Sequence, residues 1–333
     1  MPRPDPRPPL GGPSPSAARI GAVVIGRNEG PRLARCLRSL AGAGRLVYVD
    51  SGSTDGSLAT ARALGAEVVA LDPALPFTAA RARNAGAAVL AASGPPPDHV
   101  QFVDGDCELR EGWIEAAARF LDDHPRAAVV CGRRRERHPG ASVYNRLIDR
   151  EWDTPVGPAP ACGGDALMRL AALQAAGGFN PALIAGEEPE LCLRLRRAGW
   201  EVWRLDREMT WHDAALTRFG QWWTRMRRAG HACAEGAALH GAGPERYNVA
   251  RRRRALLWGA GPPLAALALA PFGAWALLPL LAWPAQVLRL GVRDGDWTWA
   301  FFVTLGKLPE TLGVAEFRLR RLRGRRARLI EYK

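Results

Sequence analysis

From Ile20 onward, short apolar runs rich in β-branched residues alternate with segments of helical length. This alternation is typical of βαβ units, in which helices connect parallel strands. The runs predicted as strands are Ile20–Ile25, Leu46–Asp50, Glu67–Ala70, Val100–Val103 and Ala127–Cys131. The helices predicted between them are Pro31–Leu40, Ser57–Leu64, Phe77–Ala92 and Gly112–His124. The pattern therefore predicts an α/β fold built on a doubly wound, mostly parallel, Rossmann-like sheet.

Three later segments extend this pattern. Gly163–Arg169 is a further candidate strand. Glu188–Ala198 is a predicted helix with acids in its first turn, arginines in its last turn and Gly199 as its end. Thr217–Leu239 is predicted as one long helix.

The C-terminal part of the chain has a different pattern. Ala255–Leu288 contains no charged residue over 34 positions, more than the roughly 20 needed to cross a bilayer. Five prolines interrupt it, so a kinked span and a re-entrant hairpin are both open, with a buried hairpin of a soluble protein as the alternative. Trp297–Val314 is also apolar but includes Lys307 and Glu310, which suits a membrane interface.

These patterns divide the chain into three parts: a tail at residues 1–18, an α/β domain at 19–240 and a helical, membrane-associated region at 241–333. The tail is rich in proline and glycine and lacks the apolar core of a signal peptide, so it is predicted to be disordered. The expected location is the cytoplasmic face of the inner cell membrane.

The positive charge is concentrated at one end of the chain. Arg251 to Lys333 contains 13 Arg and 2 Lys against 5 acids, and this +10 is most of the total of +13. The basic runs flank the apolar segment and are not interleaved with aromatic residues on a folded platform. They therefore predict contact with anionic membrane lipid and no nucleic-acid partner. The six cysteines are widely spaced and form no zinc pattern.

Acidic side chains follow two of the predicted strands. Asp104-Gly105-Asp106 comes directly after the strand Val100–Val103, and Asp50 ends an earlier strand. Mg²⁺ and Mn²⁺ are commonly held between one or two carboxylates and substrate phosphates. A plain turn uses the same residue types, so this motif alone does not decide the chemistry. Asp50 at a strand end can accept a hydrogen bond from a base imide or a ribose hydroxyl.

Two further groups have both a structural and a chemical interpretation. Glu187 and Glu188 stand at a predicted helix start, where carboxylates are favourable in any protein, but one of them can also be a general base. His212 is a candidate metal ligand or proton carrier, although a lone histidine is more often neither.

The order of these motifs resembles glycosyltransferase family 2, the inverting enzymes of GT-A fold, over about Ile20 to Leu239. The matching stretches are Val24–Glu29 (VIGRNE), Asp50–Ser57, Arg81–Gly86 (RARNAG), Asp104–Asp106, Gly177–Asn180 (GGFN), Gly186–Leu195 (GEEPELCLRL) and Arg197–Trp200 (RAGW). The resemblance implies a nucleotide-sugar donor, a divalent cofactor (Mn²⁺ or Mg²⁺) and Glu188 as the catalytic base. The family more often has Asp at that position.

The resemblance also implies roles for the other matching residues. The nucleotide sugar would be bound by Arg27, Glu29, Asp50, Ser51, Arg83, Asn84, Asp104 and Arg228. The metal would be held by Asp106 directly and by His212, and Asp104 would contact the ribose or a water bound to the metal. The acceptor side would include Asp165, Met168 and Glu187.

The expected function is the inverting transfer of a single sugar, because the Q-x-x-R-W pattern of processive synthases is missing after Gln221. UDP-, GDP- and dTDP-sugars are all possible donors. The expected acceptor is a saccharide or lipid-linked saccharide of the cell envelope. The alternatives are a nucleotidyltransferase, for which Gly26–Glu29 is a poor triphosphate loop, and a non-enzymatic basic protein that binds membrane surfaces or nucleic acid.

Overall fold

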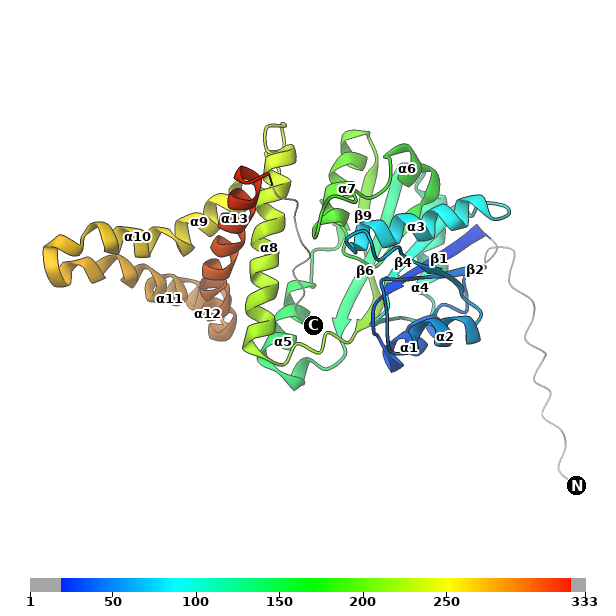
Figure 1. Ribbon diagram of the computed structural model, residues 1–333, viewed down its shortest axis with the longest axis horizontal. Coiled ribbons are helices and arrows are strands. Elements are labelled where there is room, and N and C mark those ends of the chain that lie inside the picture. The colour runs from blue at the N-terminus through cyan, green and yellow to red at the C-terminus, as the bar shows by residue number, and fades with distance from the viewer. Residues whose placement is uncertain (1–18, 325–333) are drawn as a thin grey trace, which may run out of the picture.

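The computed structural model describes residues 19–324. Figure 1 shows an α/β domain and a helical region that lie on the two sides of the long helix α8 (Phe219–His240). The tail predicted over residues 1–18 lies outside the described residues, and so does the end of the basic tail from residue 325.

The described chain contains one nine-stranded sheet with the order β3-β2-β1-β4-β8-β6-β9-β5, and β7 pairs with β9. The strands are β1 (Ile20–Gly26), β2 (Arg45–Asp50), β3 (Glu67–Ala70), β4 (His99–Asp104), β5 (Cys107–Leu109), β6 (Ala127–Glu136), β7 (Gly157–Pro158), β8 (Ala166–Arg169) and β9 (Glu201–His212). Strands β1 to β4 are parallel, and β8 is antiparallel to both β4 and β6. The sheet is therefore doubly wound in one half and mixed in the other.

Helices cover both faces of this sheet (Figure 1). One face carries α3 (Ala79–Ala92), α6 (Leu170–Ala175) and α7 (Glu187–Arg197), and the other carries α1 (Pro31–Ser39), α2 (Ser57–Ala63) and α4 (Trp113–Asp123). Neighbouring residues of β4 show the alternation. Phe102 packs edge-on against Phe179 before α7, whereas Gln101 accepts a hydrogen bond from Trp113 of α4. Because both faces are covered, the central strands are apolar at nearly every position.

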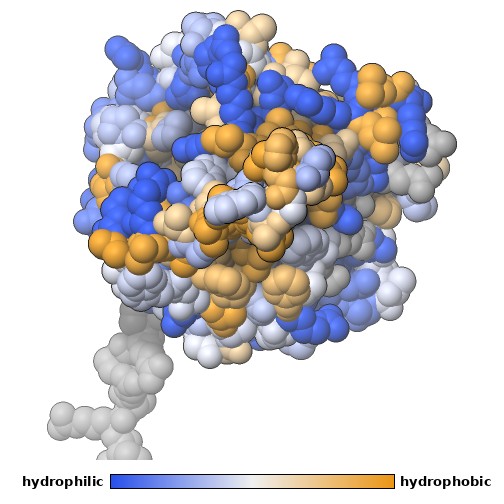
Figure 2. Space-filling model, turned by 90° about the vertical axis from the view of Figure 1, so that its left-hand side faces the viewer, coloured by the Kyte–Doolittle hydropathy of each residue, from blue (hydrophilic) through white to orange (hydrophobic). Residues whose placement is uncertain are grey.

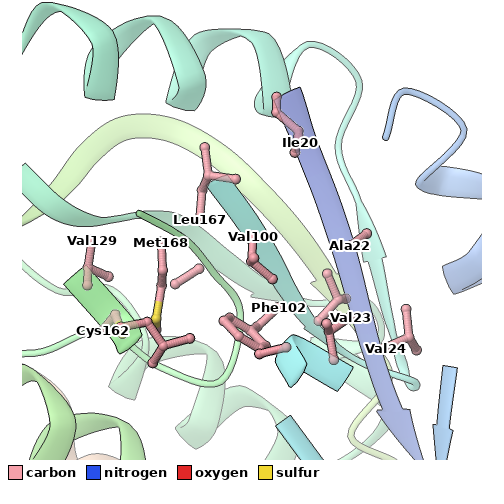
Figure 3. Packing of buried hydrophobic residues seen from close by; sticks show 14 of the residues in the cluster. Ile20, Ala22, Val23, Val24, Val100, Phe102, Val129, Cys162, Leu167 and Met168 are labelled. Atoms are coloured by element: carbon pink, nitrogen blue, oxygen red, sulfur yellow. The ribbon is translucent and has the colours of Figure 1, made fainter. Parts of the chain in front are cut away.

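The core lies between the sheet and these helices (Figure 3). Val23 of β1, Val100 of β4 and Leu167 of β8 are each 0% exposed. The strand β8 inserts between β4 and β6, so the predicted strand Gly163–Arg169 becomes a central one.

The strands that the sequence did not predict lie in the mixed half. β9 has the sequence EVWRLDREMTWH, in which charged residues interrupt the apolar pattern. β6 continues to Glu136, five residues beyond the predicted end at Cys131, through a run of three arginines. Both stretches are strands because they pair with each other, with register shifts along the way. Long-range pairing of this kind overrides local propensity.

Beyond α8 the chain forms a helical region. Its elements are α9 (Val249–Gly259), α10 (Gly261–Ala268), η3 (Ala270–Leu281), α11 (Ala282–Asp294), α12 (Trp297–Leu305) and α13 (Lys307–Leu322). Helices α9 and α10 lead away from α8, the chain turns at Gly273 with φ 67°, and η3 and α11 return (Figure 1). Trp283 Nε1 donates a hydrogen bond to the Trp258 carbonyl across this hairpin at 2.7 Å. Helix α5 (Val143–Glu151) lies near the N-terminal end of α8 (Figure 1).

The hairpin exposes apolar side chains. Leu264, Leu267 and Trp275 are 62, 70 and 69% exposed, and Figure 2 shows apolar surface at the protruding end of the molecule. Ala270–Asp294 is long and apolar enough to cross a membrane by length and composition, and 11% of its most apolar window is buried. The predicted alternative of a buried hairpin is therefore wrong, because burial would have covered these leucines.

Candidate active site

The carboxyl ends of β1, β2 and β4 meet at one edge of the sheet. In the register of the strands, Gly26 pairs with Asp50 on one side, and Ile25 pairs with Asp104 on the other. The predicted acidic residues therefore lie on the two sides of β1, at the same end of the sheet, although they are 54 positions apart in sequence. Ligand-binding groups of doubly wound sheets lie at such an edge.

Gly105 allows the Asp104-Gly105-Asp106 turn to pack closely on β1. Its amide donates to the Ile25 carbonyl at 2.8 Å. A Cβ at this position would lie 3.1 Å from the same carbonyl oxygen and 3.0 Å from Glu29 Cγ. A side chain here would push the two acids away from the edge. Glu29, one of the predicted nucleoside contacts, pairs with Arg32 at 2.9 Å.

Asp106 and His212 form the metal-binding candidate. Pairing of β5 with β9 places His212 opposite Cys107, and His212 Nε2 lies 3.2 Å from Asp106 Oδ2. Two adjacent ligand atoms of an octahedral ion, each roughly 2.1 Å from it, are about 3 Å apart. The pair therefore fits a divalent cation. The carboxylate of Asp106 is a suitable ligand for either Mg²⁺ or Mn²⁺, whereas the imidazole of His212 favours Mn²⁺ over Mg²⁺.

Cys107 completes a group of three potential ligands with these two residues. Burial raises the pKa of its thiol well above the usual value. The thiol therefore keeps its proton and faces Asp106 Oδ1 at 3.7 Å as a weak donor. The oxygen and nitrogen atoms, and not the sulfur, are the ligands that a hard cation would use.

A second cluster joins the motif to helix α7. Arg83 of α3 is 2% exposed and pairs with Asp104 at 2.8 Å, Glu187 at 2.7 Å and Glu188 at 3.0 Å. Burial opposes the charge of this guanidinium, but the three carboxylates raise its pKa above the ordinary value. Arg83 therefore holds the start of α7 beside the motif. Gly164 leaves the necessary space, since a Cβ there would lie 2.6 Å from Arg83 and 2.7 Å from Asp104.

Glu188 has the properties of a general base. Burial, followed by the charge of Glu187, raises its pKa to about 7, and Arg83 opposes that rise. The side chain is 14% exposed, whereas that of Glu187 is 5% exposed. A base works best when its pKa lies near the working pH and its oxygen can reach the substrate. Glu188 meets the first condition, and its side chain is more accessible than that of Glu187.

Arg134 and Asp165 support the motif from β6 and the loop before β8. Asp165 is 0% exposed and accepts hydrogen bonds from the Asp104 amide at 3.0 Å, Thr210 Oγ1 at 2.8 Å and Arg134 Nε at 2.9 Å. Arg134 also lies 3.3 Å from Asp104.

Two residues predicted on the acceptor side are corrected by this arrangement. Asp165 is enclosed by its three donors, so it orders Asp104 and cannot face an acceptor. Met168 is 1% exposed because β8 lies between β4 and β6, and its side chain is part of the core (Figure 3). Glu187 is buried against Arg83 and anchors that side of the site.

The predicted nucleotide contacts lie around the same edge. Asp50 accepts from Tyr48 Oη at 2.9 Å and from the amides of Gly52 and Ser53 at 2.9 and 2.8 Å, so it shapes the loop after β2. Ser51 begins that loop and donates its amide to Gly26. Arg27 lies over the Phe77 ring, 5.8 Å from its centre.

Two other predicted contacts bind backbone groups of neighbouring loops. Asn84 exchanges hydrogen bonds with the amide and the carbonyl of Phe179 at 2.9 and 2.7 Å. Arg228 of α8 donates to the Ile184 carbonyl at 2.8 Å, in the loop that leads to α7.

Three residues of this edge were not predicted: Cys107, Arg134 and Glu136. Cys107 adjoins the acidic motif, so proximity in sequence was a usable signal. Arg134 and Glu136 lie in a charged run that gave no reason to expect a strand, and only the pairing of β6 with β9 brings them to the site.

Residues 22–155 match the family model for Glycosyl transferase family 2. This segment is that of a glycosyltransferase family 2 protein. The matched residues include the acidic motif and Arg83, and α7 and His212 follow them in sequence. The sequence-based assignment to this family is therefore confirmed.

Two curated relatives are similar over most of the chain. The pre-mycofactocin glycosyltransferase of Mycobacterium tuberculosis is 28% identical over 248 residues, which are 71% of this chain and 50% of that protein. The succinoglycan biosynthesis protein ExoA of Rhizobium meliloti is 28% identical over 264 residues, covering 74% of this chain and 76% of that one. The family 2 chain thus spans about half the length of its mycobacterial relative.

The fold has a solved counterpart. The mannosyltransferase PcManGT from Pyrobaculum calidifontis, in complex with GDP-Man and Mn²⁺, has a TM-score of 0.62 and 19% identity, and the likeness covers 93% of this chain and 90% of that one. The predicted GT-A type α/β fold is therefore confirmed.

Proposed function

We propose that this protein transfers a single sugar from a nucleotide-sugar donor to a hydroxyl group, with inversion at the anomeric carbon. The observation that carries the proposal is the Arg83 cluster, which places a carboxylate with a pKa of about 7, Glu188, beside the Asp104-Gly105-Asp106 motif. Family membership supports the reaction class, and the name of the mannosyltransferase supports a nucleotide-sugar donor.

Asp106 and His212 are the residues that would hold Mn²⁺ or Mg²⁺ in this reaction, with Asp104 beside them. The cation would neutralise charge on the departing nucleoside diphosphate. Arg27, Glu29, Asp50 and Ser51 border the edge where the nucleoside would lie. UDP-, GDP- and dTDP-sugars remain the donors to test.

Glu188 would remove the proton from the attacking hydroxyl. Arg83 fixes the carboxylate at 3.0 Å, so the base is oriented before the acceptor arrives. A hydroxyl that attacks from the side opposite the leaving group gives inversion in one displacement. The reaction then needs no covalent intermediate on the enzyme.

The hairpin supports a membrane location and a lipid-linked acceptor. Its exposed leucines and tryptophans would insert among lipid chains, and the arginines at Arg251–Arg254 would meet anionic headgroups. The working location is the cytoplasmic face of the cell membrane. An apolar cavity of about 470 Å³ between α11 and α12, lined by Trp283, Leu288 and Phe301 among others, could accommodate part of a lipid chain.

A donor panel tests the proposal. Full-length protein in detergent, supplied with Mn²⁺, a lipid extract as acceptor source and each donor class in turn, should release nucleoside diphosphate from one class. Asp106→Ala should abolish this release, whereas Asp123→Ala, an exposed acid on α4, should not change it. Absence of release from every donor, or equal release by Asp106→Ala, would contradict the proposal.

A further inference from the structure

Glu136 is a buried acid that the proposed reaction does not use. It is the last residue of β6, is 1% exposed and pairs in register with His212 of β9. A buried carboxylate is costly unless it has partners, so the contacts of Glu136 indicate what it does.

The two oxygens of Glu136 face different groups. Oε1 accepts hydrogen bonds from the His138 amide at 3.0 Å and from Asn145 Nδ2 at 3.1 Å. Oε2 accepts from the Ala214 amide at 3.1 Å and lies 3.7 Å from His212 Nδ1. Oε1 thus ties together the start of α5 and its preceding loop, whereas Oε2 faces the imidazole.

The imidazole of His212 lies between two carboxylates. Nε2 faces Asp106 at 3.2 Å and Nδ1 faces Glu136, and Trp152 packs edge-on against the ring at 4.7 Å between centres. Nδ1 is buried and has no hydrogen-bond partner at this separation. A histidine that binds a metal through one nitrogen carries its proton on the other, usually directed at a carboxylate or carbonyl.

We infer that Glu136 is a positioning residue for the metal site: its carboxylate holds the proton of His212 on Nδ1, so that the lone pair of Nε2 points to the cation that Asp106 binds. The inference relies on the proposed metal-assisted function and deepens it. It also specifies which imidazole nitrogen ligates. Because Nδ1 and Oε2 are 3.7 Å apart, the inference requires the imidazole to move toward Glu136 when the cation binds.

Direct Mn²⁺ binding tests this inference without any donor or acceptor. Free Mn²⁺ is measured by electron paramagnetic resonance during titration of the full-length protein. Glu136→Gln should weaken Mn²⁺ binding by about 10- to 100-fold, the range for loss of a carboxylate behind a metal-binding histidine. Asn145→Ser is the matched control. It removes a donor to Oε1 together with the bonds of Asn145 to Leu216 and His138, but it removes no contact of Oε2 or His212. Its Mn²⁺ affinity should therefore stay within about twofold of the native value.

A double-mutant cycle separates positioning from a general role in folding. If Glu136 acts through His212, Glu136→Gln should weaken binding no further once His212→Ala is present. An equal loss in both backgrounds would overturn the inference, and so would unchanged Mn²⁺ affinity in Glu136→Gln or absence of binding by the native protein. Mn²⁺ binding that follows the cycle, together with failure of sugar transfer, would instead refute the proposed function alone.

Discussion

The polar edge of the sheet and the apolar hairpin differ in how their energetically unfavourable groups are compensated: a buried charge at the edge and exposed apolar side chains in the hairpin. At the edge, Arg83 is almost fully buried, yet three carboxylates of the same chain surround it. In the hairpin, Leu267 and Trp275 remain about seven-tenths exposed. At the edge, the buried charge of Arg83 is therefore balanced by partners within the chain. The hairpin becomes energetically favourable only against an apolar surface outside the chain.

The largest effect is expected from replacing the proposed catalytic base at the polar edge. Glu188→Gln should lower the rate of sugar transfer by roughly 10²- to 10⁴-fold, because the amide cannot accept the acceptor's proton. Donor binding, measured by calorimetry, should change little. Glu115→Gln, on the exposed side of α4, is the control and should keep the native rate. Native turnover by Glu188→Gln would exclude it as the base.

A smaller effect is expected from making the hairpin polar. Leu264, Leu267, Leu277 and Leu281 are 59 to 70% exposed, and each contributes about 1 kcal/mol when it enters an apolar phase. Their joint replacement by serine should weaken binding to anionic phospholipid vesicles by about 10²-fold or more, measured by sedimentation. Serine at Leu75 and Leu239, which are 52 and 51% exposed elsewhere, should leave vesicle binding unchanged. Equal loss of vesicle binding in both variants would show that exposed apolar side chains anywhere on the surface, and not the hairpin in particular, bind lipid.

The pH dependence of the reaction tests the role of Glu188 without a substitution, and a smaller change in rate is expected. Glu188 has a pKa of about 7, and only its ionised form can take a proton. The rate should therefore fall about tenfold per pH unit below pH 7 and level off above it. A profile of kcat/KM between pH 5 and 8 measures this limb. A rate that stays constant down to pH 5 would mean that no group with this pKa acts as the base.

The smallest effect concerns the contact between helices α8 and α13, which lies between the sheet domain and the hairpin. A Cβ on Gly313 of α13 would lie 2.0 Å from the Arg227 carbonyl oxygen of α8. Gly313→Ala should therefore separate these helices and lower stability by about 1–3 kcal/mol, seen as a lower Tm. Gly261→Ala is a matched control in α10, where the added Cβ would lie 3.8 Å from Leu257 Cδ1, an ordinary van der Waals contact. The prediction fails if both variants melt at the same temperature.

The parallel half of the fold was predictable because its strands are apolar on both faces. β1, β2 and β4 were located within one or two residues of their observed ends. β9 was missed because its charged residues are tolerated next to the outermost strand of the sheet, where the local sequence pattern carries little information. Likewise, the sequence left open whether Ala255–Leu288 is a kinked span, a re-entrant hairpin or a buried hairpin, since apolar composition does not show whether other parts of the chain cover a segment.

The candidate site was predictable where its residues are consecutive in sequence and not where strand pairing assembles it. The order of the motifs indicated Asp104, Asp106 and Glu188 as candidates, and their roles stay predictions. Glu136 and Arg134 required the register of β6 with β9, which no local signal contains. Met168 was misplaced for a related reason, because its burial depends on the insertion of β8 between two strands distant in sequence.

Arg83 has a consequence for how variants of the acidic motif behave. Asp104 and Glu188 share this one guanidinium, and the charge of Asp104 helps to raise the pKa of Glu188. Neutralising Asp104 would leave more of the Arg83 charge to Glu188 and lower the pKa of Glu188, which would make it a weaker base in the proposed reaction. The free-energy effects of substitutions at these two acids will therefore not add, because both acids depend on one buried guanidinium.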